Sequence, residues 1–197
     1  MPPMRWGLAL TLVTAFAVQD PASIATIQLT LELRVFNGAD EVTGQIRATV
    51  HRAGDRGEPM LQATASADRL QFRLPAGIYD VQAIHERDGR VLNIRWANRL
   101  VVMPYPDEPG HHLEVMNFKN GFGALQIRAP AGGRPDAAIY ESGKRDKPAG
   151  SPVGAPDYLL FVVRAGPYDL LVRSAGTSVW HTGLDVPLDR TRLWVTP

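Results

Sequence analysis

The sequence predicts an all-β protein with two tandem β-sandwich domains behind an N-terminal signal peptide. Three observations carry this prediction: apolar residues alternate with a period of two, turn residues are frequent, and one strand pattern occurs twice. The 197 residues include 18 glycines and 16 prolines, a share above the usual one for a globular chain. With 45% hydrophobic residues, the chain can bury a core.

Residues 1–17 have the features of a secretory signal peptide. Arg5 precedes an apolar run from Trp6 to Val18, which is shorter than the ~20 residues of a membrane-spanning helix. The run leads into Ala15-Phe16-Ala17, a site with small residues on both sides of a spacer, as signal peptidase requires. We expect cleavage after Ala17, a periplasmic or extracellular bacterial protein, and no membrane insertion once the signal is removed.

The expected strands follow in order along the chain. Apolar side chains occupy every second position of residues 27–35, 70–74 and 79–83, which places them on one face of an extended strand. Turn residues separate these runs, and Asp88-Gly89 predicts a tight hairpin because both central residues of such a turn need positive φ. No apolar stripe of helical period extends over three turns.

The same pattern recurs in the second half of the chain. Residues 70–81 match residues 159–170 at a constant offset of 89 positions, so that Gly77 aligns with Gly166 and Asp80 with Asp169. Residues 45–48 match 126–129, Trp96 and Leu100 match Trp180 and Leu184, and Leu113 matches Leu193. We therefore expect a first sandwich over residues 18–118 and a second over residues 119–197. The strand around Leu113 could belong to either one.

The most similar block has a structural explanation. A strand ends, a glycine turn reverses the chain, and a tyrosine packs its ring under the end of the sandwich while its hydroxyl bonds a backbone group. A binding site at this block is less favoured, since a site would rarely be duplicated with altered loops. The residues of this motif are Gly77, Tyr79, Asp80, Gly166, Tyr168 and Asp169.

Residues 72–81, Phe-Arg-Leu-Pro-Ala-Gly-Ile-Tyr-Asp-Val, resemble the late-strand signature of bacterial carboxypeptidase-regulatory-like and related transthyretin-like repeats. These prealbumin-like or immunoglobulin-like sandwiches often accompany von Willebrand factor A domains. The resemblance implies an accessory, non-catalytic role. The chain ends in Trp194-Val195-Thr196-Pro197, not in the Tyr-Arg-Gly-Ser tetrapeptide of the hydroxyisourate-hydrolysing relatives, and it lacks the Asp-x-Ser-x-Ser metal motif of the von Willebrand domain.

Charge and composition exclude several function classes. With 21 basic and 20 acidic residues and no charge block, nothing steers the chain to nucleic acid or anionic lipid. The absence of cysteine excludes disulfides, thiolate metal sites and cysteine nucleophiles. No Gly-x-Ser-x-Gly, His-Glu-x-x-His or phosphate-binding loop is present. We therefore expect no enzyme and no cofactor.

The loop over residues 104–112 is a candidate metal site because Asp107, Glu108, His111 and His112 lie close together in it. An exposed, proline-stiffened connection is the preferred interpretation, so we predict no metal. The second copy has no equivalent cluster at residues 186–190.

The function predicted is that of a scaffold or accessory protein that contacts an envelope protein partner. One alternative is a carbohydrate-binding module with Trp194 or Tyr105 as an exposed aromatic platform. A second is an edge-strand adaptor that pairs with its partner through residues 27–35. The candidate binding residues are Trp194, Tyr105, His111 and His112.

Overall fold

The computed structural model describes residues 27–65, 69–104, 110–130, 134–174 and 176–196. The predicted signal peptide over residues 1–17 lies outside the described residues, and so do Tyr105, Asp107 and Glu108. The described chain is all β, as predicted, apart from the short 3-10 turn η2 (Thr43–Gln45). No helix in these ranges is long and apolar enough to cross a membrane.

The first eight strands form two sheets, in which β1 pairs with β5, β2 and β8, and β6 lies between β3 and β7. The first sheet contains β1 (Gln28–Asn37), β2 (Asp40–Glu41), β5 (Leu70–Pro75) and β8 (His111–Asn117). The second sheet contains β3 (Ile46–Arg52), β4 (Leu61–Thr64), β6 (Gly77–Arg87) and β7 (Arg90–Val102).

The remaining strands form two further sheets, in the orders β11-β12-β9-β15 and β10-β13-β14. One contains β9 (Phe122–Arg128), β11 (Val153–Gly154), β12 (Tyr158–Arg164) and β15 (Thr191–Val195). The other contains β10 (Asp136–Glu141), β13 (Gly166–Ser174) and β14 (Thr177–Val186). The pairing repeats that of the first half: β1 and β9 each have an antiparallel neighbour and a parallel one.

The period of two fixes which side chains enter each core. In β1, Leu29, Leu31, Leu33 and Val35 are all buried between the first two sheets, as the alternation predicts. Ile27 belongs to the same alternation but is 57% exposed, because it lies one residue before the first paired residue of β1. The Asp88-Gly89 hairpin is confirmed, with φ of 52° and 72°.

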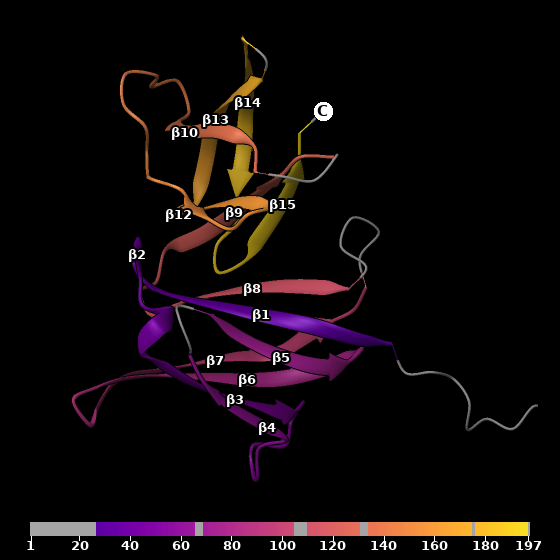
Figure 1. The fold of residues 1–197 in the computed structure, drawn as a ribbon. Helices are drawn as coiled ribbons and strands as arrows, with labels where there is room; N and C mark the ends of the chain where they lie inside the picture. Colours follow the sequence, from indigo (N-terminus) through magenta and orange to yellow (C-terminus); the bar gives the residue numbers. More distant parts are fainter. Residues whose placement is uncertain (1–26, 66–68, 105–109, 131–133, 175, 197) are drawn as a thin grey trace, which may run out of the picture.

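The four sheets are stacked face to face, and Figure 1 shows them as successive layers. The outer face of the β1–β8 pair packs on the outer face of β9 and β12, which explains why six successive residues of β12, 158–163, are buried. This junction has its own apolar cluster, distinct from the two sandwich cores. Its buried members are Phe36, Leu113, Ala124, Tyr158, Leu160 and Val162.

The strand pairing corrects one part of the predicted repeat. Residues 45–48 lead into β3, which pairs with β6, whereas residues 126–129 end β9, which pairs with β12 and β15. The two segments therefore occupy different positions, and their identity in sequence does not mark equivalent strands. The true counterpart of β3 is β10. The Val50 carbonyl in β3 accepts a hydrogen bond from the Met60 N–H, and the Ile139 carbonyl in β10 accepts the equivalent bond from the Ala149 N–H.

The pairing also settles two questions about β1 and β8. The prediction that residues 27–35 form a free edge is wrong, because β1 is hydrogen-bonded to β5 on one side and to β8 on the other. A strand with both edges paired has no backbone groups left for a partner. The strand around Leu113 is β8, and it belongs to the sheet of β1.

Candidate functional site at the junction of the two sandwiches

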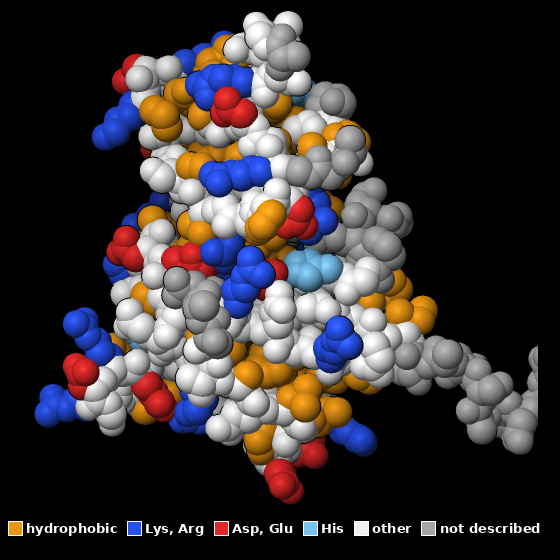
Figure 2. All heavy atoms as spheres, in the orientation of Figure 1, with side chains coloured by type: hydrophobic (Ala, Val, Ile, Leu, Met, Phe, Trp, Pro, Cys, Tyr) orange, Lys and Arg blue, Asp and Glu red, His pale blue; other side chains and the backbone are white. Residues whose placement is uncertain are grey.

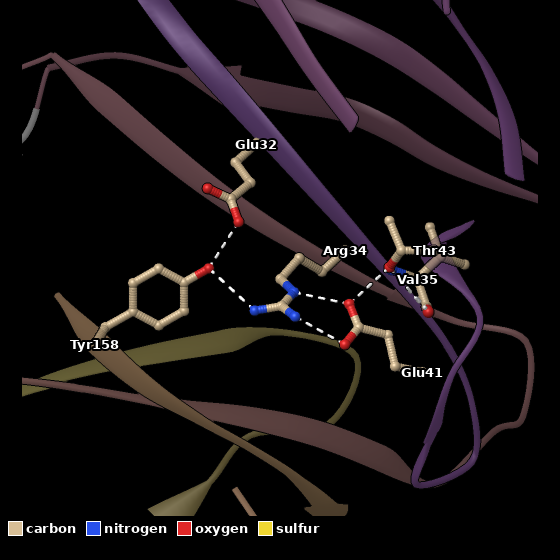
Figure 3. A network of polar contacts seen from close by, with 6 residues as sticks. All are labelled: Glu32, Arg34, Val35, Glu41, Thr43 and Tyr158. Atoms are coloured by element: carbon tan, nitrogen blue, oxygen red, sulfur yellow. Dashed lines mark hydrogen bonds and ion pairs between the residues drawn. The ribbon is translucent and has the colours of Figure 1, made fainter. Parts of the chain in front are cut away.

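A chain of polar contacts crosses the junction between the sandwiches (Figure 3). The Tyr158 hydroxyl on β12 donates to Glu32 Oε1 at 2.7 Å, and Arg34 Nη1 donates to the same hydroxyl at 3.4 Å. Arg34 also forms a two-pronged pair with Glu41, with distances of 2.8 and 2.7 Å, and Glu41 accepts a bond from Thr43. Such a paired network satisfies polar groups that the packing of two sheets removes from water.

The environment of Glu32 keeps its carboxylate charged. Burial alone would raise the pKa of Glu32, but hydrogen bonds from His111 and Tyr158 and the charges of His111 and Arg34 outweigh it, so that the pKa falls to about 2. Burial, together with the bond to Glu32, raises the pKa of Tyr158. At neutral pH the network therefore holds a carboxylate and a neutral phenol, a state suited to structural pairing and not to proton transfer.

The two candidate histidines face opposite sides of β8. His111 Nε2 lies 3.0 Å from Glu32 Oε2, so His111 belongs to the junction network. His112 is buried, and its Nε2 lies 3.8 Å from Glu114 Oε2. Neighbouring residues of a strand point to opposite faces, which is why the two rings do not converge. Within the described residues no group of three His, Cys, Asp or Glu side chains could hold a metal ion.

Trp194 packs against the core of the second sandwich instead of standing free. Its ring meets His181 edge to face, with centroids 4.7 Å apart. Trp96 and Trp180 are covered as well: the guanidinium of Arg56 lies 4.5 Å from the Trp96 ring and that of Arg145 lies 4.2 Å from the Trp180 ring. Because sugar binding needs an open aromatic face, these contacts do not favour the carbohydrate-binding alternative.

The equivalent tyrosines, Tyr79 and Tyr168, each bind the end of the preceding strand in their sandwich. The Tyr79 hydroxyl donates to the Pro75 carbonyl and the Tyr168 hydroxyl to the Arg164 carbonyl, both at 2.7 Å. The Tyr79 ring passes so close to Gly77 that a Cβ there would meet the hydroxyl at 3.1 Å. The short glycine thus makes room for the ring.

The duplicated aspartates bind the neighbouring loops. Asp80 accepts bonds from the backbone N–H groups of Arg99 and Gly54 and from the Arg56 guanidinium. These contacts, the bond from Arg99 first, lower the pKa of Asp80. Arg99 has a left-handed φ of 54°, which this bond stabilises.

Asp169 repeats the arrangement. It accepts backbone bonds from Gly183 and Gly143, together with bonds from Ser142 and Arg145. Burial raises the pKa of Asp169, but the backbone and side-chain bonds outweigh burial and lower it. Both aspartates therefore serve the fold.

Sequence reasoning missed the arginines of these two clusters. Gly54 and Arg56 precede Gly143 and Arg145 by the same 89 positions that separate Asp80 from Asp169. Extending that offset backwards through the β3 region would have found them.

A groove of about 820 Å³ opens beside the junction, within the size range of ligand sites. It is lined by parts of β7, β8 and β9 and by the turn that leads into β15. Two of its charged residues are paired with each other, since Arg95 donates to Asp189 at 2.8 Å. On the face drawn in Figure 2, basic and acidic side chains are interspersed and do not form one charged patch.

Comparisons with known proteins give no family assignment. No family profile matches the chain, and no curated protein matches it. Among solved structures it is similar to the TIE protein of Bacillus anthracis, with 13% identity and a TM-score of 0.34 over 86% of this chain; the match spans 34% of that protein.

Two further structures show a similar level of likeness. The tip fimbrial protein Mfa3 of Porphyromonas gingivalis has 9% identity and a TM-score of 0.34, with 85% of this chain and 94% of that one covered. A putative adhesin of Bacteroides ovatus has 9% identity and a TM-score of 0.32, with 89% and 88% covered. Scores this low do not establish a common fold.

Proposed function

We propose that this chain is a secreted, non-catalytic accessory protein of a bacterial envelope that binds other proteins at the groove beside the sandwich junction. The observation that carries the proposal is the groove itself, in which the described carboxylates already have basic neighbours. Glu114 lies beside His112, and Asp189 is bonded to Arg95. A site built this way offers shape and charge to a protein partner.

The proposal includes the finer features predicted from the sequence. Residues 1–17 direct secretion and are removed, residues 18–118 and 119–197 are the two copies of one ancestral unit, and the mature chain works in the periplasm or outside the cell. The resemblance to carboxypeptidase-regulatory-like and transthyretin-like repeats supports the accessory role. The repeated pairing of β1 with β8 and of β9 with β15 supports duplication.

The test is site-specific photo-crosslinking of the full chain in a bacterial host that exports it. A photoreactive residue at Val101, which lines the groove and is 43% exposed, is compared with one at Asp136, an exposed position on the outer strand β10. We expect a defined envelope protein to be captured from position 101 and not from position 136.

Two results would overturn the proposal. One is equal capture from both positions, which would deny the groove any part in binding. The other is a hydrolytic or metal-dependent turnover by the purified chain that is lost in His111→Ala or Asp107→Asn.

A further inference from the structure

We propose that the groove binds an extended acidic peptide, which adds as a strand to the free edge of β8 or of β15. This inference deepens the proposed function, on which it rests, by naming the chemistry of the partner. It follows from three features that the described residues give the groove: backbone positions, a hydroxyl and positive charges that have no partner among those residues.

The direction of the backbone groups on β8 follows from its parallel ladder with β1. Thr30 N–H donates to Gly110 O, and Phe118 N–H donates to Phe36 O. In a parallel strand the N–H and C=O of one residue point to the same side, and alternate residues point to opposite sides. The even-numbered residues of β8 therefore bond to β1, and the odd-numbered residues, Leu113 and Val115 among them, direct their backbone groups away from it.

The same reasoning applies to β15. Ala124 N–H donates to Arg190 O, and Thr196 N–H donates to Arg128 O. The even-numbered residues of β15 thus face β9, while Thr191 and Leu193 direct their backbone groups outward.

Both outward-facing pairs line the groove. Leu113, Val115, Thr191 and Leu193 all contribute to its wall. Within the described parts of the chain, β8 pairs only with β1 and β15 only with β9. Unpaired edges of this kind are the sites at which an extended peptide gains main-chain hydrogen bonds. The hydroxyl of Thr191 is buried and has no hydrogen-bond partner among the described residues, so it can bond the same peptide.

The charge of the groove favours an acidic occupant. Arg99 and Arg190 line it, are exposed, and form no ion pair with any described residue, whereas the lining residues Glu114 and Asp189 have basic neighbours. Two unpaired guanidinium groups attract a carboxylate-bearing strand and repel a basic one.

The probe is a capped, fluorescently labelled seven-residue peptide of alternating glutamate and valine, which has the length of β8. A peptide with lysine in place of glutamate is the control, and binding to the full chain is measured by fluorescence anisotropy. We expect only the acidic peptide to bind, with an affinity that decreases as salt is added. Charge reversal in the R99E/R190E double variant is expected to weaken binding by at least about tenfold, or about 1.4 kcal/mol.

Backbone pairing is tested separately from charge. Val115→Pro removes a groove-facing N–H and leaves the bonds to β1 in place, while Val115→Thr keeps that N–H. We expect Val115→Pro to weaken peptide binding about threefold to tenfold, the effect of one lost hydrogen bond, and Val115→Thr to leave it unchanged. Thr191→Val is a second variant that leaves the backbone intact, and it is expected to weaken binding by a similar factor.

Three outcomes would overturn the inference: acidic and basic peptides that bind equally, affinity that Val115→Pro and Thr191→Val both leave unchanged, or a dimer of the chain that closes the groove and excludes the peptide. If crosslinking from position 101 still captures an envelope protein while the acidic peptide fails to bind, the proposed function stands and this inference alone is wrong.

Discussion

The hydroxyl of Tyr158 donates a hydrogen bond of 2.7 Å to the carboxylate of Glu32, and the two residues lie on strands of different sandwiches. The contact sits beside the apolar cluster that joins the two inner sheets. A bond between a phenol and a charged carboxylate at such a place is directional, whereas apolar packing is not. The junction thus has a geometric preference that two merely adjacent sandwiches would lack.

Removing the Tyr158 hydroxyl is expected to destabilise the protein. In Tyr158→Phe, Glu32 Oε1 loses its donor, although His111 still contacts Oε2, and Arg34 loses one contact. We therefore expect the free energy of unfolding to fall by about 1–3 kcal/mol. Urea denaturation followed by circular dichroism measures the change. Tyr140→Phe is the matched control: Tyr140 is also buried but its hydroxyl makes no hydrogen bond to a described residue, so a loss as large as that of Tyr158→Phe would contradict the assignment.

Acid should weaken the junction over a defined range of pH. The pKa of Glu32 is lowered from 4.5 to about 2 in the folded protein, so its carboxylate stabilises the fold above pH 4.5, and this contribution is lost as the pH falls from 4.5 towards 2. Glu32→Gln carries no such charge, so the stability difference between the natural chain and the variant should shrink over that range. Urea midpoints at several pH values measure it, and a constant difference would refute the prediction.

Gly123 should tolerate no side chain. A Cβ at this position of β9 would lie 1.9 Å from the carbonyl oxygen of Pro187, so the turn between β14 and β15 would have to move. Gly123→Ala is expected to cost about 1–3 kcal/mol or more, as overpacking does. Gly110→Ala is the control in the same thermal melt, because a Cβ there meets no atom of the described residues within 4 Å. Equal losses of stability in the two variants would show that the close approach at Gly123 is absent.

The duplicated aspartates should contribute equivalently to stability. We expect Asp80→Asn and Asp169→Asn each to lower the urea midpoint, because an amide replaces a carboxylate that binds several N–H donors. Their effects should add, since they lie in separate sandwiches. Asp136→Asn, whose side chain is 67% exposed, should leave the midpoint in place. A lower urea midpoint in only one of the two variants, Asp80→Asn or Asp169→Asn, would contradict the equivalence.

Local periodicity accounts for most of the fold that sequence alone predicts. Alternation identifies β1, β5 and β6 because a residue's face is set by its own position in the strand. The pairing of strands is not local, and that is where prediction failed. The alternation of residues 27–35 predicts a strand but cannot distinguish an edge strand from a central one, which is why the predicted free edge at β1 is wrong.

The site depends still more on distant contacts. The sequence marks His111 as a candidate ligand, but its partner Glu32 lies 79 positions earlier and is brought next to it by the parallel pairing of β8 with β1. Tyr158 and Glu32 are separated by 126 positions. No spacing rule reaches across the junction of the two sandwiches. The Asp80 and Asp169 clusters could be found because their residues share one offset of 89 positions in the sequence.

The most direct test of the stacked arrangement is a double-mutant cycle on Glu32 and Tyr158. The unfolding free energies of the natural chain, Glu32→Gln, Tyr158→Phe and the double variant are measured in urea at pH 7. Stacking of the sandwiches as described predicts a coupling energy of about 1 kcal/mol or more, since contacting residues are not additive. Additivity within about 0.3 kcal/mol would show that the two residues do not meet and would contradict the junction.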